Sequence, residues 1–265
     1  MDLGFKDKVA LITGAGSQIG FGKEIALLFA KEGCAKIAVT DINEVDVRQT
    51  AAAVEKLGAA ALAVKADITK KDEVAAMAEK VLTTFGKIDI LCNVAGAILH
   101  KDNVPLDEQD EAVWTRQVEL NLFGTMKLTR AVLPYMRKQK YGAIVNIGSG
   151  STHQYAMGVG MYAMSKYAID LFTKQLAMVE AKYGIRVNCV APGPANTNFG
   201  AVLREGQPPQ TEEQRRAGRE AMARAMPLGR IGTPADIAYA AAFLASDVTG
   251  YVTGQVFHVS GGSVM

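Results

Sequence analysis

Short apolar segments alternate with longer helical segments along most of the 265-residue chain. The helical segments carry apolar residues three or four positions apart, as Ile25, Leu28 and Phe29 do. Apolar strands that alternate with helices of about ten or more residues form a parallel sheet covered by helices on both faces. The pattern therefore predicts an α/β fold with one doubly wound parallel sheet of about seven strands.

The expected strands are residues 9–13, 36–40, 61–66, 88–92, 143–147, 185–190 and 255–259, and the expected helices are 19–31, 44–57, 72–85, 112–137, 161–182 and 234–245. Gly86 should end the third helix as a C-cap glycine, and Gly124 offers a point at which the long fourth helix could break. A hydrophobic content of 49% can supply the core, and no linker divides the chain. We therefore expect residues 1–265 to form a single domain.

The segment 198–227 departs from this alternation. Pro208 and Pro209 interrupt it, and Thr211 with Gln214 has the pattern of a capping box that opens a helix. A long insertion after the carboxyl end of a strand lies where a lid over a ligand would sit. We expect a substrate lid here, and an ordinary surface helical hairpin is the alternative.

Composition and charge argue against several function classes. A formal net charge of +2 gives no reason to expect binding to nucleic acid or to an anionic membrane. No apolar run approaches the ~18 residues of a membrane span, and the start, M-D-L-G-F-K-D-K-V, lacks a secretory pattern. Cys34, Cys92 and Cys189 are widely spaced among apolar neighbours, which predicts buried reduced thiols and no metal site. We expect a cytoplasmic protein.

Glycines mark the turn from the first strand into the first helix. Gly14, Gly16 and Gly20 would let the backbone approach a pyrophosphate at the helix N-terminus. Asp41 closes the second strand about twenty residues later, where a carboxylate accepts the ribose hydroxyls of NAD and repels the 2′-phosphate of NADP. No lysine or arginine lies between Gly14 and Lys23 or between Asp41 and Arg48, so NAD is expected and NADP is less favoured. The alternative role for Asp41 is a strand-end or helix-capping acid.

Tyr162 and Lys166 stand four residues apart, which places them on one helix face. An ammonium beside a phenol stabilises the phenolate, so we expect Lys166 to lower the pKa of Tyr162 towards neutrality. Ser149 precedes Tyr162 by thirteen residues. Its alternative role is a serine that caps the turn after the fifth strand.

Eight motifs in order resemble the short-chain dehydrogenase/reductase family, whose fold is of the Rossmann type. They are T-G-A-G-S-Q-I-G (for TGxxxGxG), A-D-I-T at 66–69, C-N-V-A-G at 92–96 (for NNAG), L-N-L at 120–122, the strand ending in Ser149, Y-A-M-S-K, A-P-G-P-A-N-T at 191–197, and P-L-G-R-I-G-T-P-A-D-I with the terminal V-S-G-G. The resemblance covers nearly the whole chain. Two departures stand out: Gln18 replaces the middle glycine of TGxxxGxG, and Val94 replaces the second asparagine of NNAG.

The resemblance implies site residues and their roles. Tyr162 would act as general acid and base, with Lys166, Ser149 and Asn121 as its catalytic partners. The alternative for Asn121 is a position on a solvated face in the middle of a helix, without a catalytic role. Implied cofactor contacts are Gly14, Ser17, Gln18, Ile19, Gly20, Asp41, Asp67, Ile68, Asn93, Ala95, Gly96, Tyr162, Lys166, Pro192, Gly193, Ala195 and Thr197. Expected substrate contacts are Ser149, Ser151, His153, Tyr155, Tyr162 and Phe199.

We interpret the chain as an NAD-dependent oxidoreductase that transfers a hydride between NAD(H) and a secondary alcohol or ketone. The segments expected to line its pocket are mostly apolar, which favours a neutral, moderately hydrophobic substrate. A 3-oxoacyl thioester reductase, acting on acyl-carrier protein or coenzyme A, is the alternative within the class. A non-catalytic dinucleotide sensor or scaffold is the alternative outside it. The resemblance also implies a homotetramer.

Overall fold

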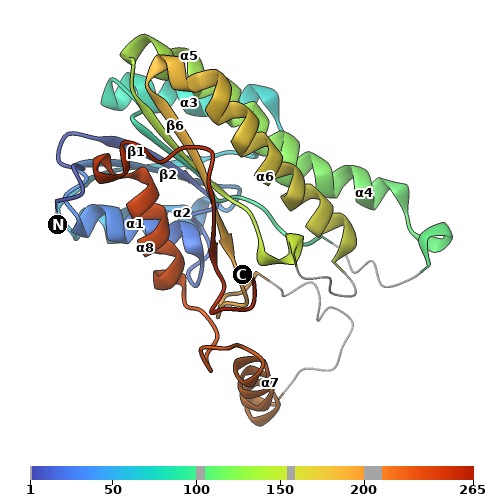
Figure 1. Ribbon diagram of the computed structural model, residues 1–265. Coiled ribbons are helices and arrows are strands. Elements are labelled where there is room, and N and C mark those ends of the chain that lie inside the picture. The colour runs from blue at the N-terminus through green and yellow to red at the C-terminus, as the bar shows by residue number, and fades with distance from the viewer. Residues whose placement is uncertain (1, 100–104, 154–158, 200–210) are drawn as a thin grey trace.

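A single seven-stranded parallel sheet forms the centre of the molecule (Figure 1). The computed structural model describes residues 2–99, 105–153, 159–199 and 211–265. The strands are β1 (Val9–Thr13), β2 (Lys36–Asp41), β3 (Ala60–Lys65), β4 (Ile90–Asn93), β5 (Gly142–Ile147), β6 (Ile185–Pro192) and β7 (Val256–Val259). Their order is β3-β2-β1-β4-β5-β6-β7. The order reverses between β1 and β4, and ligands of such sheets bind in the crevice at this reversal.

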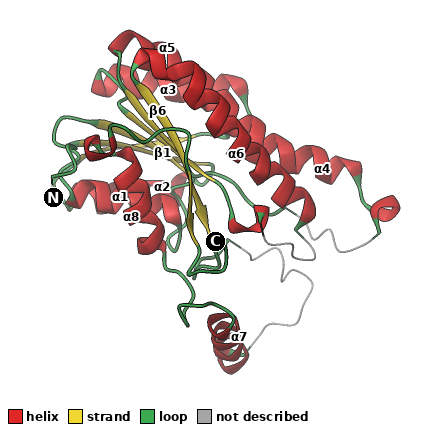
Figure 2. Cartoon of the chain, in the orientation of Figure 1, coloured by secondary structure: helices red, strands yellow, loops and turns green. Residues whose placement is uncertain are grey.

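Helices cover both faces of the sheet (Figure 2), which confirms the predicted fold class. The helices are α1 (Phe21–Lys31), α2 (Glu44–Glu55), α3 (Lys71–Phe85), α4 (Glu111–Val118), α5 (Thr125–Gln139), α6 (Gly160–Glu180), α7 (Glu212–Arg224) and α8 (Pro234–Ala245). One core joins α1, α2 and α8 to the sheet, and a second joins α3, α5 and part of α6. Because both faces are packed, the side chains of β1, β4 and β5 are buried throughout, as near-continuous apolar strands require.

The long helical segment predicted at 112–137 is interrupted near Gly124. A π-helical turn, Glu119–Gly124, joins α4 to α5. A β-carbon added at Gly124 would lie 2.7 Å from the Cδ1 atom of Ile68, so the glycine allows the helix to approach the end of β3. Single π-turns occur frequently at functional sites, and this one contains Asn121.

Two predicted helix ends are confirmed. Gly86 ends α3 with a φ of 86°, in the left-handed conformation that glycine adopts without strain. Thr211 and Gln214 form a reciprocal capping box at the start of α7. The described side chains of α7 are mostly exposed, and the helix projects from the body of the molecule at the lower end of Figure 1. Part of the proposed lid, residues 200–210, lies outside the described residues.

The three cysteines are buried and free, as predicted. Burial raises the pKa of Cys34 to about 11 and raises that of Cys92 still further. Both thiols therefore stay protonated and unreactive at neutral pH. Within residues 2–99, 105–153, 159–199 and 211–265, no helix has the length and apolar character needed to span a membrane.

Candidate active site

The glycine turn packs α1 tightly against β1. Gly20 is the N-cap residue of α1, and a β-carbon added at Gly22 would lie 2.4 Å from the carbonyl oxygen of Gly14. Gly22 is therefore the glycine that lets the helix approach the strand, whereas a β-carbon added at Gly20 would lie 2.8 Å from the Cβ atom of Ser17 within the turn. The sequence analysis had aligned Gln18 and Gly20 with the last two glycines of TGxxxGxG. The spacing G-F-G at residues 20–22, where the helix begins, is the sequence signal for Gly22.

Asp41 lies directly beneath the glycine turn. Its Oδ2 atom accepts a hydrogen bond from the Gly16 N–H at 2.9 Å, and its Oδ1 atom accepts from the Asn43 N–H at 3.1 Å. A β-carbon at Gly16 would lie 2.6 Å from the Cγ atom of Asp41. These contacts orient the carboxylate, and each oxygen retains a lone pair for a ribose hydroxyl. Asn43 is the residue that caps α2, by accepting from the Asp46 N–H, so Asp41 is not that helix cap.

Thr13 joins the turn after β4 to the end of β1. Its hydroxyl oxygen accepts from the N–H groups of Val94 and Ala95, at 3.0 and 2.9 Å. A β-carbon on Gly14 would lie 2.8 Å from the backbone of Ala95. The sequence analysis assigned no role to Thr13. Its position directly before Gly14, in the T-G pair, is the available signal.

Asn93 has a structural role in the sheet. Its Nδ2 atom donates to Thr129 Oγ1 at 3.0 Å and to Asn146 Oδ1 at 2.9 Å, and the residue is buried. Both amide hydrogens are therefore used inside the protein, and its side chain links β4 to β5 and α5. The predicted cofactor contact by Asn93 stays a prediction, since these bonds use its two amide hydrogens and leave its Oδ1 atom and its backbone for such a contact.

Asp67 and Ile68 lie where β3 leads into α3. Asp67 Oδ1 accepts from the N–H and the hydroxyl of Thr69, at 2.8 and 2.7 Å. Ile68 is buried against Gly124. Asp67 thus has an oriented carboxylate, and Ile68 is an apolar residue packed at the π-helical turn.

Asn121 is fully buried, which excludes the solvated mid-helix alternative. Its Oδ1 atom accepts from the Ala97 N–H at 3.0 Å. Its Nδ2 atom donates to the Ala97 carbonyl at 3.0 Å and to Ser165 Oγ at 3.1 Å. A β-carbon at Gly96 would lie 2.7 Å from Asn121 Oδ1 and 3.2 Å from Lys166 Nζ, so these two groups meet at Gly96.

Tyr162 and Lys166 are both buried on α6. Lys166 Nζ donates to the Ile147 carbonyl at 2.8 Å and lies 6.0 Å from the centroid of the Tyr162 ring. Burial raises the pKa of Tyr162 to about 12, and hydrogen bonding with Ser149 opposes that rise. Burial also lowers the pKa of Lys166 to about 8, and the carboxylate of Asp170 opposes that lowering. The predicted lowering of the Tyr162 pKa is therefore absent here, because desolvation outweighs the distant ammonium.

Ser149 lies at the end of β5, beside Tyr162. Its hydroxyl shares a hydrogen bond of 2.8 Å with Ser151 Oγ and accepts from the Ser151 N–H at 3.2 Å. Ser149 thus caps the 3-10 turn Gly150–Thr152, as its alternative role anticipated. Since the same hydroxyl interacts with Tyr162, capping fixes its position at the site.

The remaining predicted substrate residues differ in their position relative to Tyr162. The Phe199 ring lies 5.5 Å from the Tyr162 ring, so the start of the segment after β6 covers the tyrosine. His153 is exposed, bonds Thr152 Oγ1 through Nδ1, and packs edge-on against His258 at 4.8 Å. Tyr155 lies outside the described residues.

The loop after β6 is tied to the end of β7. Gly193 N–H donates to the Val259 carbonyl at 3.0 Å, and a β-carbon at Gly193 would lie 2.7 Å from Ser260 Cα. Ala195 forms a parallel bridge with Gly232. Pro192 and Thr197 flank these contacts. The predicted nicotinamide-binding loop therefore has a defined backbone next to the catalytic residues.

Residues beside Tyr162 that the sequence analysis did not consider come from α4. Val113, Trp114 and Gln117 line a small hollow with Tyr162. Gln117 holds the turn after β4, since it donates to the Ala97 carbonyl at 2.6 Å and accepts from the Leu99 N–H at 2.9 Å. No sequence motif marks these residues; only the packing of α4 on α6 brings them to the site.

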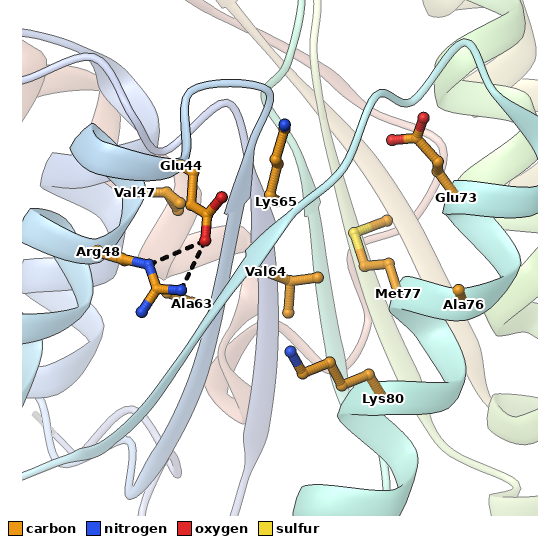
Figure 3. Close-up of a pocket in the computed structure, with 10 residues that line it drawn as sticks. All are labelled: Glu44, Val47, Arg48, Ala63, Val64, Lys65, Glu73, Ala76, Met77 and Lys80. Atoms are coloured by element: carbon orange, nitrogen blue, oxygen red, sulfur yellow. Dashed lines mark hydrogen bonds and ion pairs between the residues drawn. The ribbon is translucent and has the colours of Figure 1, made fainter.

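A cavity of about 300 Å³ lies at the outer edge of β3, between α2 and α3 (Figure 3). Its lining carries both signs of charge, with Glu44 paired to Arg48 at 2.6 Å and Lys65, Glu73 and Lys80 on its rim. None of the predicted catalytic residues lines it. It is a hollow of the sheet edge, separate from the candidate active site.

The geometry fits a dinucleotide. The N-terminus of α1 has no side-chain cap, so its N–H groups are free to meet a pyrophosphate. The glycine turn leaves no room for β-carbons, and Asp41 presents its carboxylate at the position of an adenosine ribose. Ser149, Tyr162, Lys166 and Asn121 gather at the other side of the sheet reversal. This arrangement defines a nucleotide-dependent oxidoreductase.

Known proteins resemble the chain over nearly its full length. A family profile described as Enoyl-(Acyl carrier protein) reductase matches residues 14–263. The 3-oxoacyl-(acyl-carrier-protein) reductase FabG of Thermotoga maritima is 38% identical, with 97% of this chain and 98% of that protein covered.

Two solved structures are also similar. One, 7α-hydroxysteroid dehydrogenase complexed with NADH and 7-oxo glycochenodeoxycholic acid, has a TM-score of 0.88 and 36% identity, covering 99% of this chain and 96% of the other. NAD⁺-bound xylitol dehydrogenase has a TM-score of 0.87 and 30% identity, covering 97% and 99%. The chain belongs to the short-chain dehydrogenase/reductase family. It is an oxidoreductase that transfers a hydride between a nicotinamide dinucleotide and a secondary alcohol or its ketone.

Proposed function

We propose that the chain is an NAD-dependent dehydrogenase of neutral, moderately hydrophobic secondary alcohols, and a reductase of the matching ketones. The observation that carries the proposal is the buried group of Asn121, Ser149, Tyr162 and Lys166 beside the glycine turn. A protein that only sensed or stored a dinucleotide would have no need to bury these four polar groups together. This argues against the sensor or scaffold alternative.

The proposed reaction assigns a separate role to the dinucleotide, to Tyr162 and to Ser149. The bound dinucleotide supplies or accepts the hydride. In ketone reduction Tyr162 donates its phenolic proton to the carbonyl oxygen, and in alcohol oxidation its oxygen accepts the hydroxyl proton. Ser149 donates a hydrogen bond to the same substrate oxygen, where negative charge develops. The capping contact with Ser151 holds Ser149 ready for this role.

Lys166 and Asn121 support the tyrosine. A charged Lys166 favours the phenolate and so opposes the effect of burial on the pKa of Tyr162. Asn121 holds the Ala97 backbone and Ser165, and its Oδ1 atom faces Lys166 Nζ across Gly96. The π-helical turn places this amide where an ordinary helix would not. Asn121 thereby positions the turn after β4 against Lys166.

Asp41 supports NAD as the preferred cofactor. Its carboxylate is oriented by two backbone N–H groups and would face a 2′-phosphate with like charge. The two similar solved structures hold NADH and NAD⁺, according to their descriptions. A 3-oxoacyl thioester reductase remains the second candidate, favoured by the match to FabG of T. maritima.

The proposal is tested by incubating the purified chain with a panel of secondary alcohols and NAD⁺ or NADP⁺, and following formation of the reduced cofactor. Acetoacetyl-coenzyme A, with NADH or NADPH, tests the second candidate. We expect turnover of cyclic or aliphatic secondary alcohols with NAD⁺. Turnover confined to the thioester would favour the second candidate, and binding without any turnover would favour the sensor.

The proposed assembly is a homotetramer in the cytoplasm. Large apolar side chains are exposed on two separate surfaces, one around α6 and one on α8 and β7; they are Met164, Tyr167, Leu171, Tyr239, Phe243 and Phe257. Two self-complementary surfaces on one chain generate a tetramer with twofold contacts. Light scattering should give the mass of four chains, and a stable monomer at micromolar concentration would contradict this proposal.

The segment 198–227 is proposed to act as a substrate lid. Its first part reaches the catalytic tyrosine through Phe199, and α7 is exposed in a way that leaves its position to be set by a ligand. Hydrogen exchange in α7 should slow when cofactor and substrate are both present. Equal exchange with and without them would support the surface hairpin instead.

A further inference from the structure

The turn between β1 and α1 is longer than the family pattern. In TGxxxGxG three residues separate the first two glycines. Here the G-x-G at the start of the helix is Gly20 and Gly22, of which Gly22 packs on Gly14, so five residues separate Gly14 from Gly20. A longer loop loses more conformational freedom when it is held in one shape. The turn therefore needs additional contacts to present a fixed backbone to a ligand.

The side chain of Gln18 supplies such contacts. Its Nε2 atom donates to the Gly16 carbonyl at 2.8 Å and to the Asp46 carbonyl at 3.1 Å. Its Oε1 atom accepts from Lys23 Nζ at 2.7 Å. Gly16 belongs to the turn, Asp46 to the first turn of α2, and Lys23 to the first turn of α1. One amide thus joins three segments.

Lys23 determines which way this amide faces. An ammonium group only donates hydrogen bonds, so it must meet the oxygen of Gln18. The amide nitrogen then points at two carbonyl oxygens, which only accept. The charge on Lys23 and the two carbonyls therefore select the same orientation of Gln18.

The contacts of Gln18 lead to Asp41. Gly16, whose carbonyl Gln18 binds, donates its own N–H to Asp41 Oδ2. Asp46, the other carbonyl partner, is hydrogen-bonded to Asn43, and the Asn43 N–H donates to Asp41 Oδ1. Both hydrogen bonds that orient the Asp41 carboxylate thus come from residues linked to Gln18: Gly16 directly, and Asn43 through Asp46. The exposed position of Gln18 gives it no share in the hydrophobic core.

We propose that Gln18 and Lys23 are positioning residues for the adenosine half of the dinucleotide. They hold the lengthened turn closed, so that Gly16 and Asp41 meet the adenosine ribose in a fixed arrangement. Gln18 thereby acts through Gly16 and Asp41. This inference rests on the proposed dinucleotide function, and it adds Lys23, a residue that the family pattern leaves unassigned.

The test measures binding of ADP-ribose, which contains the adenosine half and lacks the nicotinamide, by isothermal titration calorimetry. Gln18→Ala should raise the Kd for ADP-ribose about tenfold, the scale of losing one or two net hydrogen bonds. Lys23→Met should raise it about threefold, and Lys23→Arg, which retains a donor, should restore most of the affinity. In turnover, the loss should fall on the KM for NADH rather than on kcat.

Gln139→Ala is the matched control. Gln139 donates one hydrogen bond to the Ile88 carbonyl at 3.0 Å, at the opposite end of the sheet. Its variant should bind ADP-ribose as the parent does. All variants should melt within about 2 °C of the parent in the absence of ligand, the shift expected for surface changes well below 1 kcal/mol.

The outcomes separate this inference from the proposed function. If the parent does not bind ADP-ribose, the dinucleotide function fails, and the inference fails with it. If the parent binds and Gln18→Ala binds equally well, the inference alone is overturned. It is also overturned if the affinity of Gln18→Ala falls only together with a large drop in melting temperature, because Gln18 would then be a general stabilising residue.

Discussion

The two sides of the active-site edge are built differently. On the dinucleotide side, the ends of β1, β2 and β4 approach so closely that added β-carbons at Gly14, Gly16 and Gly22 would lie within 3 Å of neighbouring atoms. On the proposed substrate side, the described side chains of α7 are mostly exposed, and Gly218 has no atom within 4 Å of an added β-carbon. The first side is held by close backbone contacts, whereas the described part of α7 is exposed.

This difference suggests how one fold serves many substrates. The dinucleotide is the same in every turnover, so its side can be built from close backbone contacts that any substitution would disturb. The relatives differ in the compounds that their names give, since they include a 7α-hydroxysteroid dehydrogenase, a xylitol dehydrogenase and a 3-oxoacyl-(acyl-carrier-protein) reductase. Contacts made by loosely packed segments can change without disturbing the sheet. The four residues proposed to be catalytic are buried.

The largest expected effect comes from one of these buried residues. Tyr162→Phe retains the ring and its packing with Phe199 but removes the oxygen that exchanges the proton. Turnover should fall by at least about 10²-fold, the usual scale for losing a general acid or base. The Kd for NADH, measured by fluorescence, should change little. Near-normal turnover would remove Tyr162 from the proton transfer and restore the sensor or scaffold alternative.

Cofactor choice tests the dinucleotide side directly. We expect kcat/KM to favour NAD⁺ over NADP⁺ by about 10²-fold, equivalent to about 2.7 kcal/mol. Asp41→Ala should narrow this ratio, because it removes both the ribose acceptor and the repulsion of the 2′-phosphate. Steady-state kinetics with both cofactors make the comparison.

A role for Lys23 as a ligand of the 2′-phosphate would predict the use of NADP⁺ instead. The variant Lys23→Met distinguishes that role from the NAD preference attributed to Asp41. Through Gln18 and Gly16, the ammonium of Lys23 is connected to Asp41. If the unmodified chain used both cofactors equally, and Lys23→Met lost NADP⁺ selectively, Lys23 would be acting as a phosphate ligand. The predicted NAD preference would then be wrong.

A pair of glycine substitutions compares the packing of the two sides. Gly22→Ala would place a methyl group 2.4 Å from the Gly14 carbonyl oxygen, so the free energy of unfolding should fall by about 1–3 kcal/mol. Gly218→Ala, in the exposed helix α7, should raise it by up to about 1 kcal/mol, because alanine favours helix. Urea denaturation measures both. Equal changes in the two variants would contradict the contrast drawn between the regions.

The smallest expected effect is on pH dependence. Burial lowers the pKa of Lys166 to about 8, so its positive charge is present below that pH and lost above it. If this charge supports Tyr162, kcat/KM for ketone reduction should decline as pH rises through about 8. Asp170 raises the pKa of Lys166, so Asp170→Asn should shift the decline to lower pH. An unchanged rate up to pH ~9.5 would show that Lys166 acts without its charge.

Much of the fold could be predicted because the pattern is strong. Seven apolar strands alternate with helices, and both the periodicity and the lengths leave a covered parallel sheet as the natural solution. Helix ends marked by characteristic residues could also be predicted from the sequence, such as Gly86 and the capping box of Thr211 and Gln214. Motifs of fixed spacing predicted the four residues of the candidate active site, and the structure brings them together; they are Asn121, Ser149, Tyr162 and Lys166.

What the sequence by itself determined is the set of strands and helices, their parallel arrangement and the chemical types gathered at the active-site edge, since these follow from local periodicity and spacing. The tertiary structure alone decided that Gly22 packs on Gly14, that Gln18 and Lys23 close the turn over Asp41, and that burial raises the pKa of Tyr162. Each of these depends on the distance between residues that adjoin only after folding, or on the water that packing excludes. Spacing along the chain records neither quantity.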